Sequence, residues 1–91
     1  MELQQIIEKN KHLFWYFDKK KLDKITKPIL IEFILNYGDM TALRELLETL
    51  GKEEVAREFA KAIKNDRHNY FPQVKNFFHL YFQRYVPQYP F

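Results

Sequence analysis

The strongest pattern in this chain of 91 residues is an apolar stripe near its C-terminal end. Its members recur at spacings of three and four residues, as they do along one face of an α-helix: Val74, Phe77, Phe78, Tyr81, Phe82 and Tyr85. Pro72 precedes them at a position that suits the first turn of a helix, where a missing N–H costs little. The sequence therefore predicts an amphipathic helix with one broad aromatic face.

Four earlier segments are predicted to be helical as well, at residues 2–10, 26–37, 39–50 and 53–63. The second of them is apolar on nearly every side, apart from Glu32 and Asn36, which share a narrow polar edge. We therefore expect this helix at the centre of the fold. No segment shows the alternation of a convincing β-strand. The predicted fold is all-α, a compact bundle of four to five short helices.

Single residues mark where these helices begin and end. Thr26 and Asp39 are expected to be N-caps, because their side chains accept hydrogen bonds from the first turn. Gly38 and Gly51 are each expected to end a helix, Gly38 in the left-handed conformation that glycine tolerates.

The segment "LFWYF", residues 13–17, contains the only tryptophan and is followed by a run of lysines. A strand would need a second one to pair with, so we interpret the run as a connector between the first and the central helix. Leu13, Phe14 and Phe17 are expected to be buried. Trp15 and Tyr16 are expected nearer to the surface, which makes them candidate protein-binding residues.

The ending "VPQYPF" holds two prolines and is predicted to be an extended tail, residues 86–91, after a single domain of residues 1–85. Tyr85, Tyr89 and Phe91 are candidate anchors for a protein partner, because aromatic side chains dominate binding energy at interfaces. The alternative is that the tail folds back over the core of its own domain.

The residues that nucleophilic hydrolases usually employ are missing. The chain contains no serine and no cysteine, so the usual nucleophiles and thiolate metal sites are excluded. His12, His68 and His79 are scattered without the spacing of metal ligands, and the two glycines follow helices rather than forming a phosphate cradle. We expect no catalytic residue, no metal and no cofactor.

No stretch of the sequence has the length or composition of a secretory signal or a membrane-spanning helix. The longest apolar segment, residues 29–35, is interrupted by Glu32. The expectation is a soluble, cytoplasmic protein with no membrane partner.

Charge is unevenly distributed along the chain. Residues 9–27 carry seven lysines against two aspartates and contain no arginine. Lysines attract phosphates without reading bases, so this stretch predicts, as an alternative function, a nucleic-acid-binding surface. Its candidate residues are Lys19, Lys20, Lys21, Lys24 and Lys27, with Lys9 and Lys11 beside them. A solvated lysine-rich surface is the competing interpretation.

Several short pieces resemble one family. They are "LFW" at Leu13–Trp15 with Asp18, "KLD" at Lys21–Asp23, "YGD" at Tyr37–Asp39, "GKE" at Gly51–Glu53 and "NFFHLYF" at Asn76–Phe82. Their order is similar to that in a family of small, functionally uncharacterised prokaryotic proteins, encoded beside nucleotidyltransferase-type toxins. The resemblance implies the antitoxin side of such a pair, a nucleotidyltransferase-type toxin as partner and no established catalytic residue.

These observations together predict a non-enzymatic protein–protein interaction domain, the antitoxin or regulatory partner of a second protein. Trp15, Tyr16, Tyr85, Tyr89 and Phe91 are its candidate binding residues. The aromatic last helix would suit a homodimer interface as well as it suits a core. Nucleic-acid binding by the lysine-rich stretch remains the alternative.

Overall fold

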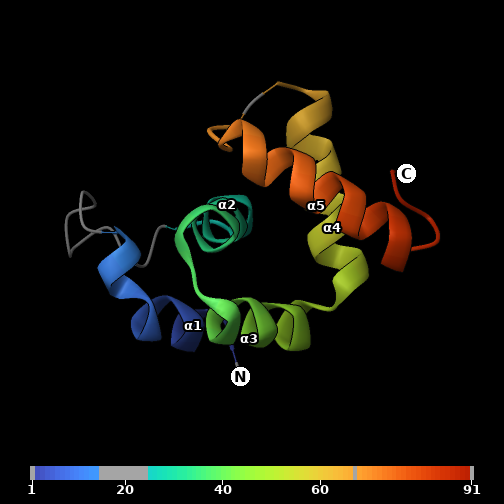
Figure 1. The fold of residues 1–91 in the computed structure, drawn as a ribbon. Coiled ribbons are helices and arrows are strands. Elements are labelled where there is room, and N and C mark those ends of the chain that lie inside the picture. The colour runs from blue at the N-terminus through green and yellow to red at the C-terminus, as the bar shows by residue number, and fades with distance from the viewer. Residues whose placement is uncertain (1, 15–24, 67, 91) are drawn as a thin grey trace.

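A computed structural model describes residues 2–14, 25–66 and 68–90 of the chain (Figure 1). Its elements, in order, are α1 (Leu3–Lys9), the 3-10 turn η1 (Lys11–Phe14), α2 (Lys27–Tyr37), α3 (Met40–Leu50), α4 (Lys52–Lys64) and α5 (Pro72–Tyr85). The described residues contain no strand. The predicted all-α bundle is confirmed, and the four earlier helices lie where their spacing placed them.

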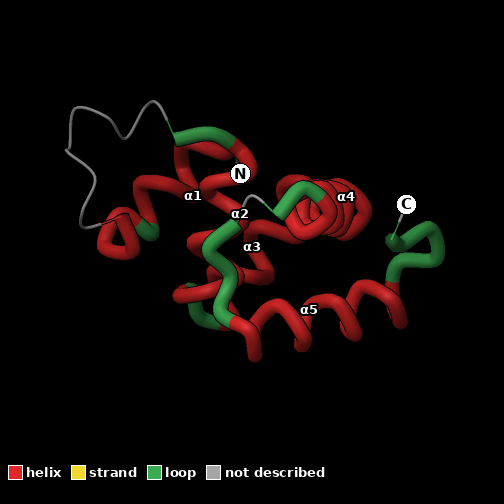
Figure 2. The backbone as a smooth tube through the Cα atoms, turned by 90° about the horizontal axis from the view of Figure 1, so that it is seen from above, coloured by secondary structure: helices red, strands yellow, loops and turns green. Residues whose placement is uncertain are grey.

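The helices are arranged around α2. This helix contacts η1, α3 and α4, while α1 packs on α3 and α5 packs on α4. α1 and η1 lie at one end of the molecule, and α4, α5 and the C-terminal turn lie at the other (Figures 1 and 2). Five side chains of α2 are buried, namely Leu30, Ile31, Phe33, Ile34 and Leu35. The nearly all-round apolar sequence of this helix is therefore explained by its central position.

Phe14 joins the N-terminal part of the chain to this core. Its side chain is fully buried, and its ring lies 4.8 Å from the ring of Phe33 on α2. The expected burial of Phe14 is confirmed, and Leu13 beside it is half-buried against the same cluster. Trp15, Tyr16 and Phe17 lie outside the described residues.

The polar edge of α2 fixes the loop that leads into α5. The Asn36 side chain donates to the carbonyl of Asn69, 3.1 Å away, and accepts from the backbone N–H of Phe71 at 3.2 Å. The Glu32 carboxylate accepts from the backbone N–H of Asn69. Three hydrogen bonds from two side chains thus hold residues 69–71 against the central helix, and α5 begins directly after them.

The helix ends agree with the sequence in part. Asp39 caps α3, accepting from the backbone N–H of Ala42 at 2.8 Å, and Gly51 ends that helix as expected, with a left-handed φ of 88°. Thr26 occupies the N-cap position of α2, but its side chain makes no capping hydrogen bond.

Gly38 corrects the prediction of a left-handed helix end. Its φ of −75° and ψ of 162° are extended, so conformation alone does not require glycine. A Cβ at this position would lie 2.7 Å from the Ile34 carbonyl oxygen and 3.3 Å from the Ala42 Cβ. Glycine is needed because the turn between α2 and α3 passes too close to both helices for a side chain.

The C-terminal tail is not extended, which corrects the prediction of an extended tail after residue 85. Residues 87–90 form a turn, and the N–H of Tyr89 donates to the carbonyl of Val86 at 3.0 Å. Val86 and Tyr89 are both buried. The Tyr89 ring lies 5.9 Å from the ring of Phe82 and 6.5 Å from the ring of Phe59. The turn places the side chains of Val86 and Tyr89 on one side of the backbone, which allows both to be buried.

Candidate protein-binding groove

Helix α5 is apolar on two sides. Phe78 and Phe82 point into the core, where Phe82 lies 5.4 Å from Phe59 of α4. Phe77 and Tyr85 belong to the same predicted stripe, yet they are 58% and 50% exposed. The predicted aromatic stripe is therefore packed on the protein only where it meets α4.

The exposed side of α5 faces apolar side chains of α3 across a groove. Leu43 and Leu47 of α3 are half-buried, and Met40 at its start is 73% exposed. Two adjoining hollows, of about 510 and 410 Å³, share Met40, Leu43 and Phe77 in their linings and therefore form one continuous groove. We name it the α3–α5 groove.

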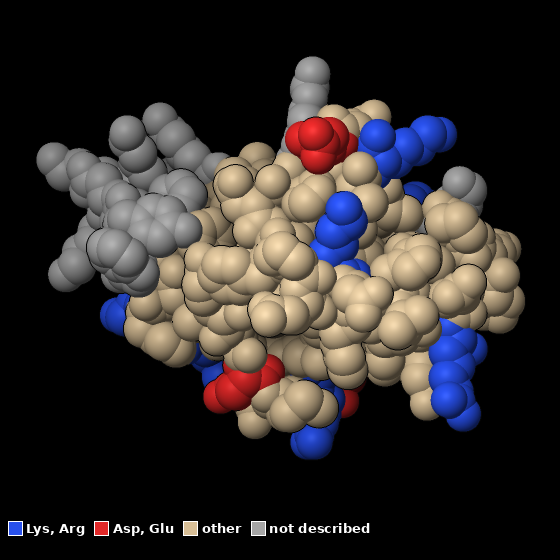
Figure 3. Space-filling model, turned by 45° about the horizontal axis from the view of Figure 1, so that its top comes forward, with Lys and Arg blue, Asp and Glu red and all other residues tan. Residues whose placement is uncertain are grey.

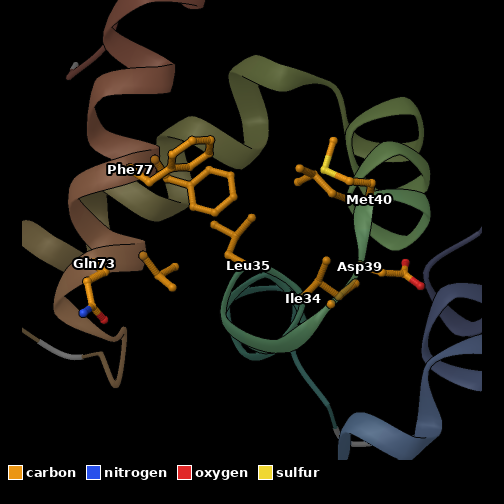
Figure 4. Close-up of a pocket in the computed structure, with 10 residues that line it drawn as sticks. Ile34, Leu35, Asp39, Met40, Gln73 and Phe77 are labelled. Atoms are coloured by element: carbon orange, nitrogen blue, oxygen red, sulfur yellow. The ribbon is translucent and has the colours of Figure 1, made fainter.

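The floor of the α3–α5 groove comes from the central helix. Ile34 and Leu35 of α2 lie at its base, between Met40 on one side and Phe77 on the other (Figure 4). Tyr81 extends the α5 wall toward the far end of α3, and its ring is stacked at 6.3 Å from that of Phe77. The walls and floor are thus built from aliphatic and aromatic side chains of three helices.

The groove exists because α5 is anchored elsewhere. Phe59 of α4 holds Phe78 and Phe82 of α5, with ring centroids 6.4 and 5.4 Å apart. At the start of α5, the hydrogen bonds from Asn36 and Glu32 fix the preceding loop on α2. Since both anchors draw α5 toward α2 and α4, its opposite side is left uncovered beside α3.

Charged side chains stand at the margin of the groove rather than inside it. Asp39, Arg44 and Glu48 line it at the start and along α3, and Lys52 lines it from the start of α4; no ion pair joins any two of them within the described part of the chain. On the face of the molecule that Figure 3 shows, a broad uncharged area has Lys, Arg, Asp and Glu side chains around it. An apolar centre with a polar rim is the usual composition of a protein-binding surface.

The aromatic residues predicted to bind a partner fall in different places. Tyr85 is half-exposed at the end of α5, 4.9 Å from Tyr81, and the Arg84 guanidinium lies 5.7 Å from its ring centroid. Tyr89 is buried on the protein's own core, so it offers little surface to a partner. Trp15, Tyr16 and Phe91 are outside the described residues.

The lysines predicted to bind nucleic acid are only partly described. Lys27 lies 3.1 Å from Glu54, and its ammonium, together with Arg57, holds the pKa of Glu54 below its ordinary value. Lys9 lies 2.6 Å from Glu45 of α3. Both ends of the lysine-rich stretch are therefore paired with acids of the same chain. Lys19, Lys20, Lys21 and Lys24 lie outside the described residues.

The histidines occupy unrelated positions. His12 is exposed, His68 lies 3.8 Å from Asp66, and His79 shares a hydrogen bond with Tyr89. Among the residues with described positions, no three histidine, aspartate or glutamate side chains come together as metal ligands. In the same part of the chain, none of the helices has both the length and the apolar character needed to span a bilayer.

Comparison with models of known protein families, with curated proteins and with solved structures finds no match to this chain.

Sequence reasoning did not bring the groove residues together as a site. Met40, Leu43 and Leu47 have regular helical spacing, and so do Phe77 and Tyr81, which is the same signal that buried residues give. The one sequence signal that points to the groove is an excess of large apolar side chains on α5. With Leu80 added, α5 carries more large apolar side chains than one buried face of a 14-residue helix accommodates.

Proposed function

We propose that this protein is a non-enzymatic protein-binding domain whose α3–α5 groove receives an amphipathic helix of a partner protein. The observation that carries the proposal is the groove itself, an apolar channel flanked by Met40 and Phe77, which are 73% and 58% exposed. Large apolar side chains gathered on one surface are characteristic of interaction sites. The resemblance to antitoxins of nucleotidyltransferase-type toxins supports a toxin of that kind as the partner.

The shape of the groove favours a helix as its occupant. Its two walls are the helices α3 and α5, of 11 and 14 residues, with α2 as a floor. A helix of 14 residues is about 21 Å long, which gives space for three to four turns of a partner helix. Helix-in-groove recognition uses apolar anchors at three- and four-residue spacing, and the rim charges Arg44, Glu48 and Lys52 would then meet the polar flanks of the bound helix.

The test compares two substitutions that place the same charge on α5. Phe77→Glu puts a carboxylate into the groove, whereas Gln83→Glu puts one at an exposed position that does not line it. The partner tested is the product of the neighbouring gene, and binding is measured by isothermal titration calorimetry. We expect Phe77→Glu to weaken binding by at least about tenfold and Gln83→Glu to leave it nearly unchanged. Both variants should keep the helical circular dichroism spectrum of the parent.

Three other results would contradict parts of this proposal. Equal binding by both variants would move the binding site away from the groove. No binding by the parent, combined with a dimer in light scattering that Phe77→Glu dissociates, would assign the groove to a second copy of the chain. Retention on duplex DNA that Lys19→Glu with Lys20→Glu abolishes would favour the nucleic-acid function predicted from the lysine-rich stretch.

A further inference from the structure

A second hollow lies on the other side of α5, between α4 and the C-terminal turn. Its volume is about 580 Å³. One wall is the C-terminal half of α4, and the opposite wall consists of His79 from α5 with Tyr89 and Pro90 from the turn. It shares no lining residue with the α3–α5 groove, so the inference drawn from it does not depend on the function proposed above.

The α4 wall of this hollow is basic. Arg57, Lys61 and Lys64 recur at spacings of four and three residues and therefore lie on one face of the helix. Arg57 is engaged with Glu54 at 3.2 Å, whereas no ion pair involves Lys61 or Lys64 within the described residues. None of the described side chains that line the hollow is acidic. The Cα atoms of Lys61 and Lys64 are about 4.5 Å apart along the helix axis, so their flexible side chains can reach one anion.

The base of the hollow is apolar. Ala60 and Ile63 are half-buried between the basic residues of α4, and Pro90 stands opposite them. Lysines in the last turn of a helix usually interact only with the helix dipole and solvent. Here they border a concave surface that a flat or aliphatic group can enter, which an isolated helix end does not provide.

The docked tail completes the site. Tyr89 is buried against Phe59 and Phe82, and a hydrogen bond of 2.8 Å joins its Oη to Nδ1 of His79. This bond fixes the imidazole plane, so the orientation of the second ring nitrogen, Nε2, is set as well. With the tail extended into solvent, only His79 would remain opposite the lysines.

We propose that this hollow binds an oxyanion, a phosphate or a carboxylate, that is attached to an apolar or aromatic body. Lys61 and Lys64 hold the anionic group, and His79 borders it from α5. The apolar body rests on Ala60, Ile63 and Pro90. Oxyanions pair with ammonium groups through charge-assisted hydrogen bonds, and burial of the body supplies the remaining affinity.

The test is a titration of the full chain followed by two-dimensional ¹H–¹⁵N NMR with four probes. Phenyl phosphate and phenylacetate carry both halves of the ligand, inorganic phosphate carries only the anion, and benzyl alcohol carries only the ring. We expect shifts of the backbone signals of Ala60, Lys61, Ile63, Lys64 and His79 with one of the two combined probes. That probe should bind at least about tenfold more tightly than inorganic phosphate or benzyl alcohol, because of the buried ring. The tighter of the two combined probes identifies the anion as phosphate or carboxylate.

The matched variants are Lys61→Ala with Lys64→Ala against Lys11→Ala with Lys75→Ala, which removes the same amount of charge. Neither Lys11 nor Lys75 lines the hollow or the α3–α5 groove. The first double variant should lose at least about fivefold in affinity for the combined probe, while the second should lose almost none. Equal losses in both, equal affinity for all probes or no localised shifts would overturn the proposal and leave ordinary attraction to a positively charged protein.

Discussion

Gly38 shows that the reason for a residue can differ from the one its type suggests. Its backbone conformation is open to any residue, but the space beside it is not. We predict that Gly38→Ala destabilises the protein by about 1–3 kcal/mol, as overpacking at a close contact does, because the new Cβ would clash with the Ile34 carbonyl. Urea unfolding of parent and variant measures the difference. A gain of stability, which alanine gives where it fits, would show that the turn can shift at little cost.

The buried side chain of Tyr70 makes the free energy of unfolding depend on pH in the alkaline range. Burial above all, and then Glu32 and Glu58, raise the pKa of this phenol well above its ordinary value of 10. The folded protein therefore keeps the proton where the unfolded chain loses it, so the free energy of unfolding is unaffected below pH 10 and declines as the pH rises beyond it. The decline that one such group causes is at most about 1.4 kcal/mol per pH unit.

The variant Tyr70→Phe isolates this effect. Because the phenylalanine has no proton to lose, we expect the variant to lose less stability than the parent between pH 10 and pH 11. Some dependence on pH should remain, since burial also raises the pKa of Tyr89. Urea unfolding at pH 8, 10 and 11 provides the comparison, and parallel curves for the two proteins would contradict the expected role of Tyr70.

At the scale of elements, the two sides of α5 should respond differently to the same substitution. Phe82 is fully buried against Phe59, whereas Phe77 is mostly exposed on the groove. We predict that Phe82→Ala lowers the free energy of unfolding by about 3–5 kcal/mol and that Phe77→Ala lowers it by less than about 1.5 kcal/mol. Thermal melting followed by circular dichroism distinguishes them. Equal losses would mean that the groove is closed in solution.

The C-terminal turn is the second element whose stability can be measured. Tyr89→Phe removes the hydrogen bond to His79 but keeps the ring, so it should cost about 0.5–1.5 kcal/mol. Tyr89→Ala also removes the ring from Phe59 and Phe82 and should cost more than about 2 kcal/mol. If both variants unfold like the parent in urea, the turn is not docked on the core, and Tyr89 is again a candidate residue for binding a partner.

The sequence predicts elements better than their relative placement. Asp39 and Gly51 mark helix ends through local chemistry, which is why both were identified correctly. The groove depends instead on Asn36 and Glu32 binding a loop more than thirty residues away, and no local pattern reports such a contact. The same limit applies to Tyr89. The two neighbouring prolines favour an extended chain, and the burial of the Tyr89 ring depends on Phe59, which is distant in the sequence.

The whole molecule has little stability to spare. A domain of 91 residues is typically stable by about 5–14 kcal/mol. Phe14 is fully buried against Phe33 and ties the N-terminal helices to the centre of the fold. We predict that Phe14→Ala costs about 3–5 kcal/mol, a large share of this stability, and lowers the melting temperature measured by circular dichroism. A variant that melts like the parent but loses its partner would make this aromatic run a docking patch.

The open side of α5 also links the lifetime of the chain to its partner. A ligand that binds only the folded state stabilises it by about 2.7 kcal/mol when its free concentration is 100 times Kd. For a small domain that amount changes the unfolded fraction by about two orders of magnitude. Under the proposed function, the abundance of the partner would therefore decide how fast proteases remove this protein. Phe77 and Met40 are exposed in the free chain and covered in the complex, so the complex would be the longer-lived form in the cell.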